Sequence, residues 1–264
     1  MKWSIIPIVW VTLTFGFSAA AAELTADQIV EKANKASYYA GTDGRAQVKM
    51  VITDRRGGTR ERAFSILRMD VEGADQKFYV YFTEPGDVRK MAFLVWKHVG
   101  PGTEDDRWLW LPALNLVRRI APGDKRTSFV GSDFFYEDVS GRNVNADHHE
   151  LVETTDEYYL IKNSPIDATT VEFSSYHVWI DRKSFLPRKA EYYDKKKEVY
   201  RRVEATRLET VEGHPTVMES EAHDLKLGGH TVMRFSHVDY DIGMKETIFS
   251  ERFLRRPPRE VLAR

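Results

Sequence analysis

Polar and apolar residues alternate along most of the chain, which is the pattern of half-buried β-strands. Val48, Met50 and Ile52 form one such series, and residues 76–83 form another. Glycine, proline and charged residues separate the series at intervals too short for parallel crossovers, so the strands are predicted to be antiparallel. We expect roughly ten to eleven strands, a number that must curl or close to bury its apolar faces.

One stretch, residues 105–141, concentrates aromatic residues among charges. Trp108 and Trp110 share one face of a predicted strand, and Leu109 and Leu111 share the other. Because both faces are apolar, we expect one face to meet the core. The other then needs a lid, a cavity or a partner.

Helical signals occur near the two ends of the chain. Residues 24–38 are predicted to form an amphipathic helix, with Thr25 and Gln28 as a capping box and Gly41 just past its end. Its apolar stripe is narrow, so we expect this helix to lie on a sheet. A short closing helix is predicted at 246–254, before two prolines.

Residues 1–22 have the organisation of a secretory signal peptide. Lys2 provides a positive start, residues 5–17 are an apolar run, and Ala20 and Ala22 occupy the positions of a cleavage site. We therefore expect cleavage before Glu23, export, and one folded domain over residues 23–264. The alternative is an uncleaved membrane anchor.

Composition narrows the functional class. The chain has 264 residues, of which 42% are hydrophobic and 30% are charged, and its formal net charge is -1. These values are typical of a folded soluble protein, and indicate neither a nucleic-acid partner nor an integral membrane protein. The chain has no cysteine, which excludes disulfides, thiolate metal sites, a cysteine nucleophile and an N-terminal diacyl anchor.

Eight histidines raise the question of a metal site. In a hairpin that turns at Gly228 and Gly229, His223 is predicted to lie opposite Arg234, and His237 opposite Ser220. That register places His223 and His237 on opposite faces of the sheet, where they cannot share a metal. We predict surface histidines and no metal site.

Catalytic patterns are absent from the sequence. It has no G-x-S-x-G nucleophile motif and no phosphate-binding glycine loop followed by a helix. Carboxylate pairs such as Asp105 with Glu137 can be chosen, but no spacing distinguishes one pair. We predict a protein without catalytic residues or a cofactor, and therefore not an enzyme.

A basic run occurs at a predicted hairpin turn. It consists of Lys195, Lys196 and Lys197, followed by Arg201 and Arg202. Nearby acidic residues dilute the positive field, which favours a solvated turn. The alternative is a contact with phospholipid headgroups or with a partner.

The alternating apolar residues of the first half predict one continuous inner wall. Its members are Met50, Ile52, Phe64, Phe78, Val80, Phe82, Phe93 and Val95. Two interpretations fit this pattern equally, an ordinary filled core and a ligand cavity. A curled sheet of about ten strands can enclose more room than its own side chains fill.

Several motifs resemble those of a known family. They are W-L-W-L-P-A at 108–113, R-R-I at 118–120, G-S-D-F-F-Y-E-D at 131–138, and the tail at 249–257. This set is similar to the outer-membrane lipoprotein-sorting protein family, which belongs with the LolA/LolB-like periplasmic carriers. The resemblance covers essentially all of residues 23–264. It implies an incomplete antiparallel β-barrel, in which an N-terminal helix and short lid helices cover a hydrophobic cavity.

The resemblance also implies a function. Such a protein is a soluble periplasmic carrier, which binds acyl chains of lipoproteins or lipids for transfer toward the outer membrane. An inner-membrane exporter and an outer-membrane acceptor are the implied partners, and the lack of cysteine suits a carrier better than a lipidated acceptor.

Within that interpretation, the eight wall residues line the cavity, and the lid or rim consists of Trp108, Trp110, Phe134 and Phe135. The alternatives are a β-barrel module for another small apolar ligand and a structural envelope protein without a ligand.

Overall fold

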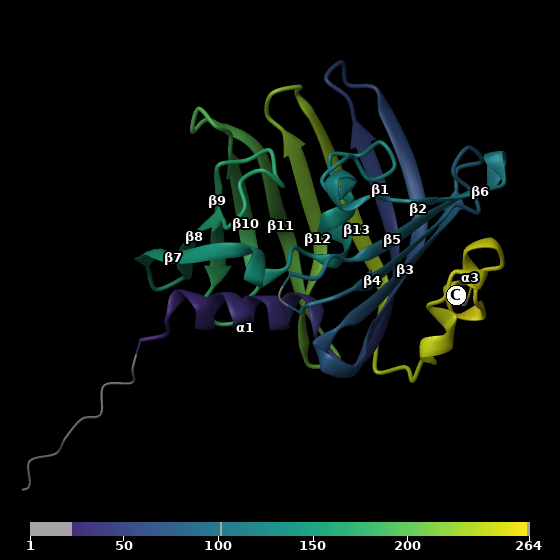
Figure 1. Cartoon of the computed structure of the whole chain (residues 1–264), viewed down its shortest axis with the longest axis horizontal. Coiled ribbons are helices and arrows are strands. Elements are labelled where there is room, and N and C mark those ends of the chain that lie inside the picture. The colour runs from purple at the N-terminus through teal and green to yellow at the C-terminus, as the bar shows by residue number, and fades with distance from the viewer. Residues whose placement is uncertain (1–22, 101, 263–264) are drawn as a thin grey trace, which may run out of the picture.

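The computed structural model describes residues 23–100 and 102–262, so the predicted signal peptide, residues 1–22, lies outside the described residues. Within this part the strands form one antiparallel sheet of thirteen members (Figure 1). Their order across the sheet is β6-β5-β4-β3-β2-β1-β13-β12-β11-β10-β9-β8-β7. The predicted mainly-β fold, an incomplete barrel with an N-terminal helix and short helices, is confirmed. The prediction that residues 23–264 form one domain remains a prediction.

Two meanders make up the sheet. The first contains β1 (Asp43–Thr53), β2 (Thr59–Asp70), β3 (Gln76–Glu84), β4 (Ala92–Lys97), β5 (Asp106–Leu111) and β6 (Leu116–Arg119). The second contains β7 (Asp147–Thr154), β8 (Tyr158–Pro165), β9 (Ser175–Asp181), β10 (Pro187–Tyr193), β11 (Val199–Val211), β12 (His214–Asp224) and β13 (Gly229–Tyr240). The sheet has thirteen strands where roughly ten to eleven were predicted, and its short edge strands, β6 and β7, pair with β5 and β8.

The first and last strands of the chain are paired at the centre of the sheet, with Val48 opposite Phe235 and Met50 opposite Met233. Consequently β6 and β7, which follow one another in sequence, lie at opposite edges. The chain between them, residues 120–146, has to cross the inner face of the sheet. We call it the crossing segment. It contains η3 (Pro122–Asp124), α2 (Tyr136–Ser140) and η4 (Val144–Ala146).

Helix α1 (Ala26–Tyr38) forms as predicted, with a capping box in which Thr25 and Gln28 each accept the other's backbone N–H. Its apolar stripe, Ile29 and Ala33, is buried against Ile161 and other side chains of the second meander. The helix therefore covers the inner face near β7 and β8 (Figure 1).

The C-terminal segment covers the outer face of the first meander. It contains η5 (Glu246–Ile248), α3 (Arg252–Arg255) and η6 (Arg259–Val261), so the single helix predicted at 246–254 is broken into separate turns. Its buried members, Met244, Ile248, Phe249, Leu254 and Val261, pack against the side chains of β2 to β5. The outer apolar face of β5 is thus covered by the end of the same chain.

Hydrogen bonds fix this segment to the sheet. Tyr79 Oη donates to the carbonyl oxygen of Phe253 at 2.7 Å, and Trp96 Nε1 donates to that of Phe249 at 2.8 Å. Indole and phenol groups commonly find such partners when they are buried. The indoles of Trp96 and Trp108 pack edge to face, with their ring centres 4.9 Å apart.

The predicted register of the β12–β13 hairpin was wrong. His223 lies opposite His230, not opposite Arg234, and Ser220 lies opposite Met233, not opposite His237. The turn comprises residues 225–228, because the Asp224 carboxylate accepts the backbone N–H groups of two residues that follow it. A longer turn shifts the pairing along both strands.

Among the described residues, no helix is both long enough and apolar enough to span a membrane.

Phe249 should anchor the C-terminal segment, because its side chain is 1% exposed among the aromatic residues of the outer face. We expect Phe249→Ala to lower the free energy of unfolding by about 3–5 kcal/mol. Urea titration measures this change. The control Leu262→Ala, at a side chain that is 56% exposed, should change it by less than about 0.5 kcal/mol. Equal effects of the two substitutions would show that the segment is not an integral part of the fold.

Candidate functional site

A cavity of about 480 Å³ lies between α1, the crossing segment and the inner face of the sheet. This volume is within the range of ligand pockets in proteins. Most of its lining is aliphatic or aromatic, and includes Val30, Ala33, Ala36, Tyr38, Phe134, Ile161, Val178, Ala190, Tyr192, Val203, Ala205, Val217, Met233 and Phe235.

One row of cross-strand neighbours forms the floor of the cavity. Ile161 of β8 lies opposite Val178 of β9, which lies opposite Ala190 of β10, which in turn lies opposite Val203 of β11. Facing residues of an antiparallel sheet share a face, so these four side chains point to the same side. Ala190 is small, and so are Ala33 and Ala36 of α1, which line the same cavity. Small side chains on both walls leave the space empty.

Three of the eight predicted wall residues border this cavity. They are Phe64, Phe78 and Val80, which close the end of the cavity nearest the first meander. Each is at most 4% exposed.

The other five predicted wall residues lie deeper, in the core beneath the crossing segment. They are Met50, Ile52, Phe82, Phe93 and Val95. Phe129 of the crossing segment packs on this group, with its ring centre 5.8 Å from that of Phe82 and 5.6 Å from that of Phe93. The inner face of the first meander is therefore filled, whereas that of the second meander is hollow.

The four predicted lid residues are not brought together. Phe134 lines the cavity, and Phe135 stacks beneath the guanidinium of Arg201, 4.1 Å from its carbon. Trp108 and Trp110 point to the outer face, where the C-terminal segment covers them. Leu109, between them, points inward to the core. The alternation of faces in β5 was thus predicted correctly, but the cover of its outer face is the C-terminal segment.

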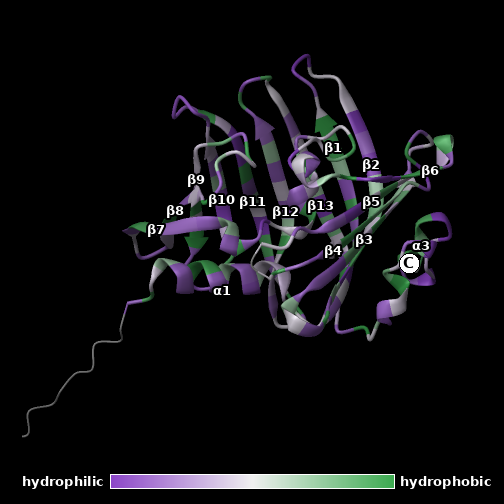
Figure 2. Cartoon of the chain, viewed as in Figure 1, coloured by the Kyte–Doolittle hydropathy of each residue, from purple (hydrophilic) through white to green (hydrophobic). Residues whose placement is uncertain are grey.

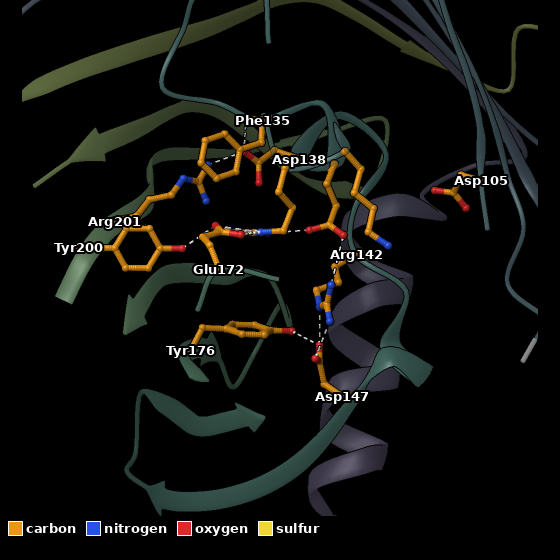
Figure 3. Close-up of polar contacts among 12 residues, drawn as sticks. Asp105, Phe135, Asp138, Arg142, Asp147, Glu172, Tyr176, Tyr200 and Arg201 are labelled. Carbon is orange, nitrogen blue, oxygen red and sulfur yellow. Dashed lines mark hydrogen bonds and ion pairs between the residues drawn. The ribbon is translucent and has the colours of Figure 1, made fainter. Parts of the chain in front are cut away.

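A buried ion-pair network holds the crossing segment across the inner face (Figure 3). Glu137 of α2 accepts from Arg126 at 2.6 Å and from Arg142 at 3.3 Å, and its side chain is 4% exposed. Burial raises the pKa of Glu137, but the two guanidinium groups lower it by more, so the pKa lies below its ordinary value. Glu137 therefore stays ionised and bound between two arginines, which leaves it unsuited to general acid catalysis.

Each arginine continues the network to the second meander. Arg142 pairs with Asp147 at the start of β7 at 2.7 Å, and Tyr176 of β9 donates to the same carboxylate at 2.8 Å (Figure 3). Arg126 pairs with Glu172 at 2.9 Å, and that carboxylate also accepts from Tyr200 of β11. The network therefore ties the crossing segment to β7, β9, β11 and the loop before β9.

A third arginine reaches the crossing segment from β11. Arg201 is 2% exposed, and its guanidinium donates to the Asp138 carboxylate of α2. Arg202, the next residue, points to the other side and pairs with Glu191 at 3.1 Å. The basic run predicted from the sequence is thus divided. Arg201 and Arg202 form ion pairs with other parts of the fold, whereas Lys195 to Lys197 are exposed at the turn.

A second, more polar cavity of about 860 Å³ lies on the other side of α1. Lys97 of β4 borders it, is 2% exposed, and donates from Nζ to the carbonyl oxygen of Ser140 at 2.7 Å. Burial lowers the pKa of Lys97 to about 8, and Arg107 adds to this shift, while Asp105 and Glu137 oppose it.

Within residues 23–100 and 102–262, no three side chains among His, Asp and Glu converge in a way that could hold a metal ion.

Comparison with known proteins identifies the family. A family model described as "Uncharacterized protein" matches residues 74–256, which is more than half of the chain. The chain belongs to this family. A search of curated proteins finds no match.

Solved structures show which fold the family has. A DUF1329 family protein from Desulfovibrio piger is 27% identical, with a TM-score of 0.80 over 87% of this chain and 97% of that chain. A protein from Vibrio parahaemolyticus, provisionally named an outer membrane lipoprotein-sorting protein domain, is 25% identical, with a TM-score of 0.79 over 88% of this chain and 98% of that chain. A LolA superfamily protein from Nitrosomonas europaea is 21% identical, with a TM-score of 0.68 over 88% and 100% of the two chains, which shows a shared fold. These matches confirm the resemblance that the sequence motifs indicated.

The sequence contained signals for the parts of the site that were not predicted. Val178, Ala190 and Val203 each lie on a different strand, and alanine and valine suggest less about a ligand than the phenylalanines of the first meander. Arg126, Glu137 and Arg142 lie within or beside the signature motifs. Their partners Asp147 and Glu172 are distant enough in sequence that only the folded chain reveals the pairs.

Glu137 should be essential for holding the crossing segment. We expect Glu137→Gln to lower the free energy of unfolding by about 3 kcal/mol, because the buried Arg126 and Arg142 lose a shared counter-charge. Glu172→Gln is the control. Its side chain is 42% exposed, so that change should be at most about 1 kcal/mol. Chemical denaturation measures both. A smaller effect at Glu137 than at Glu172 would contradict the central place of Glu137.

Lys97 should make stability depend on alkaline pH. Its folded-state pKa, about 8, lies below the unfolded value of 10.5, so the buried charge destabilises the fold fully below pH 8 and less as pH rises toward 10.5. We expect the wild type to gain stability relative to Lys97→Met between about pH 7 and about pH 9.5. Urea titration at both pH values tests this. Parallel pH profiles would show that Lys97 is not desolvated.

Proposed function

We propose that this protein is a soluble periplasmic carrier that binds acyl chains of lipoproteins or lipids for transfer toward the outer membrane. Residues 1–22 would be removed as a signal peptide, and residues 23–264 would act as one binding domain. The observation that carries the proposal is the apolar cavity of about 480 Å³ between α1, the crossing segment and the sheet. The LolA-like fold and the sorting-protein relative support it.

In this proposal the acyl chain lies along the row from Ile161 to Val203, with Phe64, Phe78 and Val80 at one end. Phe134 forms part of the rim. Met50, Ile52, Phe82, Phe93 and Val95 would extend the same wall when the crossing segment moves away. Trp108 and Trp110 would support the wall from outside by binding the C-terminal segment.

The energetics of the cargo restrict how a carrier can work. Each buried methylene contributes about 0.8 kcal/mol, so a chain of roughly sixteen carbons is stabilised in a bilayer by about 12 kcal/mol. A cavity that merely matched the bilayer would hold cargo without moving it in either direction. The proposed partners, an inner-membrane exporter and an outer-membrane acceptor, would load and unload the carrier, and opening of its cover would permit exchange.

Ala190 offers a direct test, because it is a small residue in the middle of the cavity floor. We expect Ala190→Trp to reduce the amount of bound acyl lipid at least about tenfold, since the indole fills the space of the ligand. The measurement is native mass spectrometry of protein purified from a Gram-negative periplasm, followed by lipid extraction.

Arg188→Trp is the matched control for that experiment. Arg188 lies in the same strand, is exposed, and does not border the cavity. It should leave lipid binding unchanged. A small discrete ligand in the wild type would favour a binding module for another apolar compound, and wild-type protein that carries no ligand would contradict carriage.

A further inference from the structure

Three hairpin turns lie together where the strands of the sheet end, uppermost in Figure 1. They are residues 54–58 between β1 and β2, residues 194–198 between β10 and β11, and residues 224–228, which are the last residue of β12 and the turn that joins it to β13. We call these three turns the basic edge. The proposed function does not use them.

Contacts between the turns show that they form one surface. Lys226 of one turn pairs with Asp194 of the next at 2.6 Å. On its other side, a methyl group placed on Gly228 would lie 3.6 Å from the Cβ atom of Arg55. The three turns therefore lie side by side.

The strip presents positive charge. Its fifteen positions contain six basic residues, namely Arg55, Arg56, Lys195, Lys196, Lys197 and Lys226, and four acidic ones, which gives a net charge of +2. Every basic residue among them is exposed. The β10–β11 turn is hydrophilic in Figure 2.

Three of the four carboxylates are engaged within their own turns. Asp54 accepts the backbone N–H groups of Arg56 and Gly58, and Asp224 accepts those of Lys226 and Leu227. Asp194 accepts from Lys226 Nζ and from backbone N–H groups of its own turn, and these bonds lower its pKa to about 2. The carboxylates thus shape the turns, and of the six basic side chains Lys226 pairs with one of them while all six are exposed.

Two leucines stand among these cations. Leu225 is 45% exposed and Leu227 is 69% exposed, on either side of Lys226. Basic side chains around protruding apolar ones match a surface of anionic headgroups over hydrocarbon. An acidic protein surface would give the leucines no such apolar layer.

We propose that the basic edge docks the protein on anionic phospholipid membranes, with Leu225 and Leu227 entering the headgroup region. This inference rests on the proposed function for its purpose, because a carrier must meet a membrane or a membrane-bound partner to exchange cargo.

The ends of β2 and β13 next to the basic edge contact the crossing segment, which covers the cavity. Arg60, the second residue of β2, donates to the carbonyl oxygen of Gly131 in the crossing segment at 3.4 Å. At the start of β13, Thr231 Oγ1 donates to the Asp133 carboxylate at 2.6 Å. Docking through the basic edge therefore brings the membrane beside the crossing segment, where cargo would enter or leave.

Vesicle sedimentation tests the docking with two variants. The first replaces Lys195, Lys196 and Lys197 by glutamate, and the second replaces Leu225 and Leu227 by serine. We expect the wild type to bind vesicles of phosphatidylcholine mixed with phosphatidylglycerol and to bind vesicles of phosphatidylcholine alone at least about tenfold more weakly. The charge variant should lose at least about tenfold in affinity for the anionic vesicles, and the wild-type affinity should fall with added salt. The leucine variant should bind the anionic vesicles at least about fivefold more weakly.

Matched controls change the same properties elsewhere. Lys183, Arg207 and Arg256 replaced by glutamate give the same change in net charge, and Val152 and Ile242 replaced by serine remove two exposed apolar groups. Both controls should bind anionic vesicles like the wild type. Equal binding to both kinds of vesicle, no binding to either, or equal losses in the controls would overturn the docking surface.

Acyl binding, measured separately, distinguishes this inference from the proposed function. If the charge variant and the leucine variant lose vesicle binding but still purify with acyl lipid, both the docking surface and the carrier function are supported. Wild-type protein that binds anionic vesicles but carries no acyl lipid supports the docking surface and contradicts the carrier. Wild-type protein that carries acyl lipid but binds both kinds of vesicle equally supports the carrier function and contradicts the docking surface.

Discussion

The buried pairing of Glu137 with Arg126 and Arg142 is the interaction on which the rest of the structure depends. Because β1 pairs with β13 at the centre, β6 and β7 are at opposite edges, and the chain between them must cross the inner face. A crossing backbone carries polar groups into an apolar space, where each needs a partner. Lys97 donates to the carbonyl oxygen of Ser140, and Thr231 accepts the backbone N–H of Asp133. The ion pairs of Arg126 with Glu172 and of Arg142 with Asp147 hold the segment to the second meander. Once it is fixed, Phe129 and Phe134 occupy defined places, and the inner space has a cover.

The shape of the inner space follows from the size of the side chains on each half of the sheet. The first meander presents Phe64, Phe82 and Phe93 to the crossing segment, and Phe129 fills the space between them. The second meander lines the cavity with smaller residues such as Val178, Ala190 and Val203, and α1 contributes Ala33 and Ala36. Close packing is therefore achieved on one half and not on the other. A cavity beside a rigid, filled core is suited to hold an apolar chain, because the core keeps its walls apart.

The two sides of the sheet serve different purposes. The outer face of β2 to β5 is as apolar as the inner one, yet the C-terminal segment covers it with hydrogen bonds from Tyr79 and Trp96. This arrangement explains why residues 105–111 carry large apolar groups on both faces. The large apolar residues of that stretch therefore make two different contacts, one with the inner core and one with the C-terminal segment. The residues that line the cavity lie elsewhere.

The sequence by itself determined the strands, the capped helix α1, the alternation of faces within each strand and the family, since these depend on neighbours in the chain or on local motifs. It also placed Phe64, Phe78 and Val80 on the inner wall. The tertiary structure decided the central pairing of β1 with β13, the path of the crossing segment, and the partners of Glu137. It further decided that Trp108 faces the C-terminal segment, and that the hollow lies over Ala190. Each of these results depends on which distant segments meet, and the period of a strand specifies that its faces are buried without specifying by what.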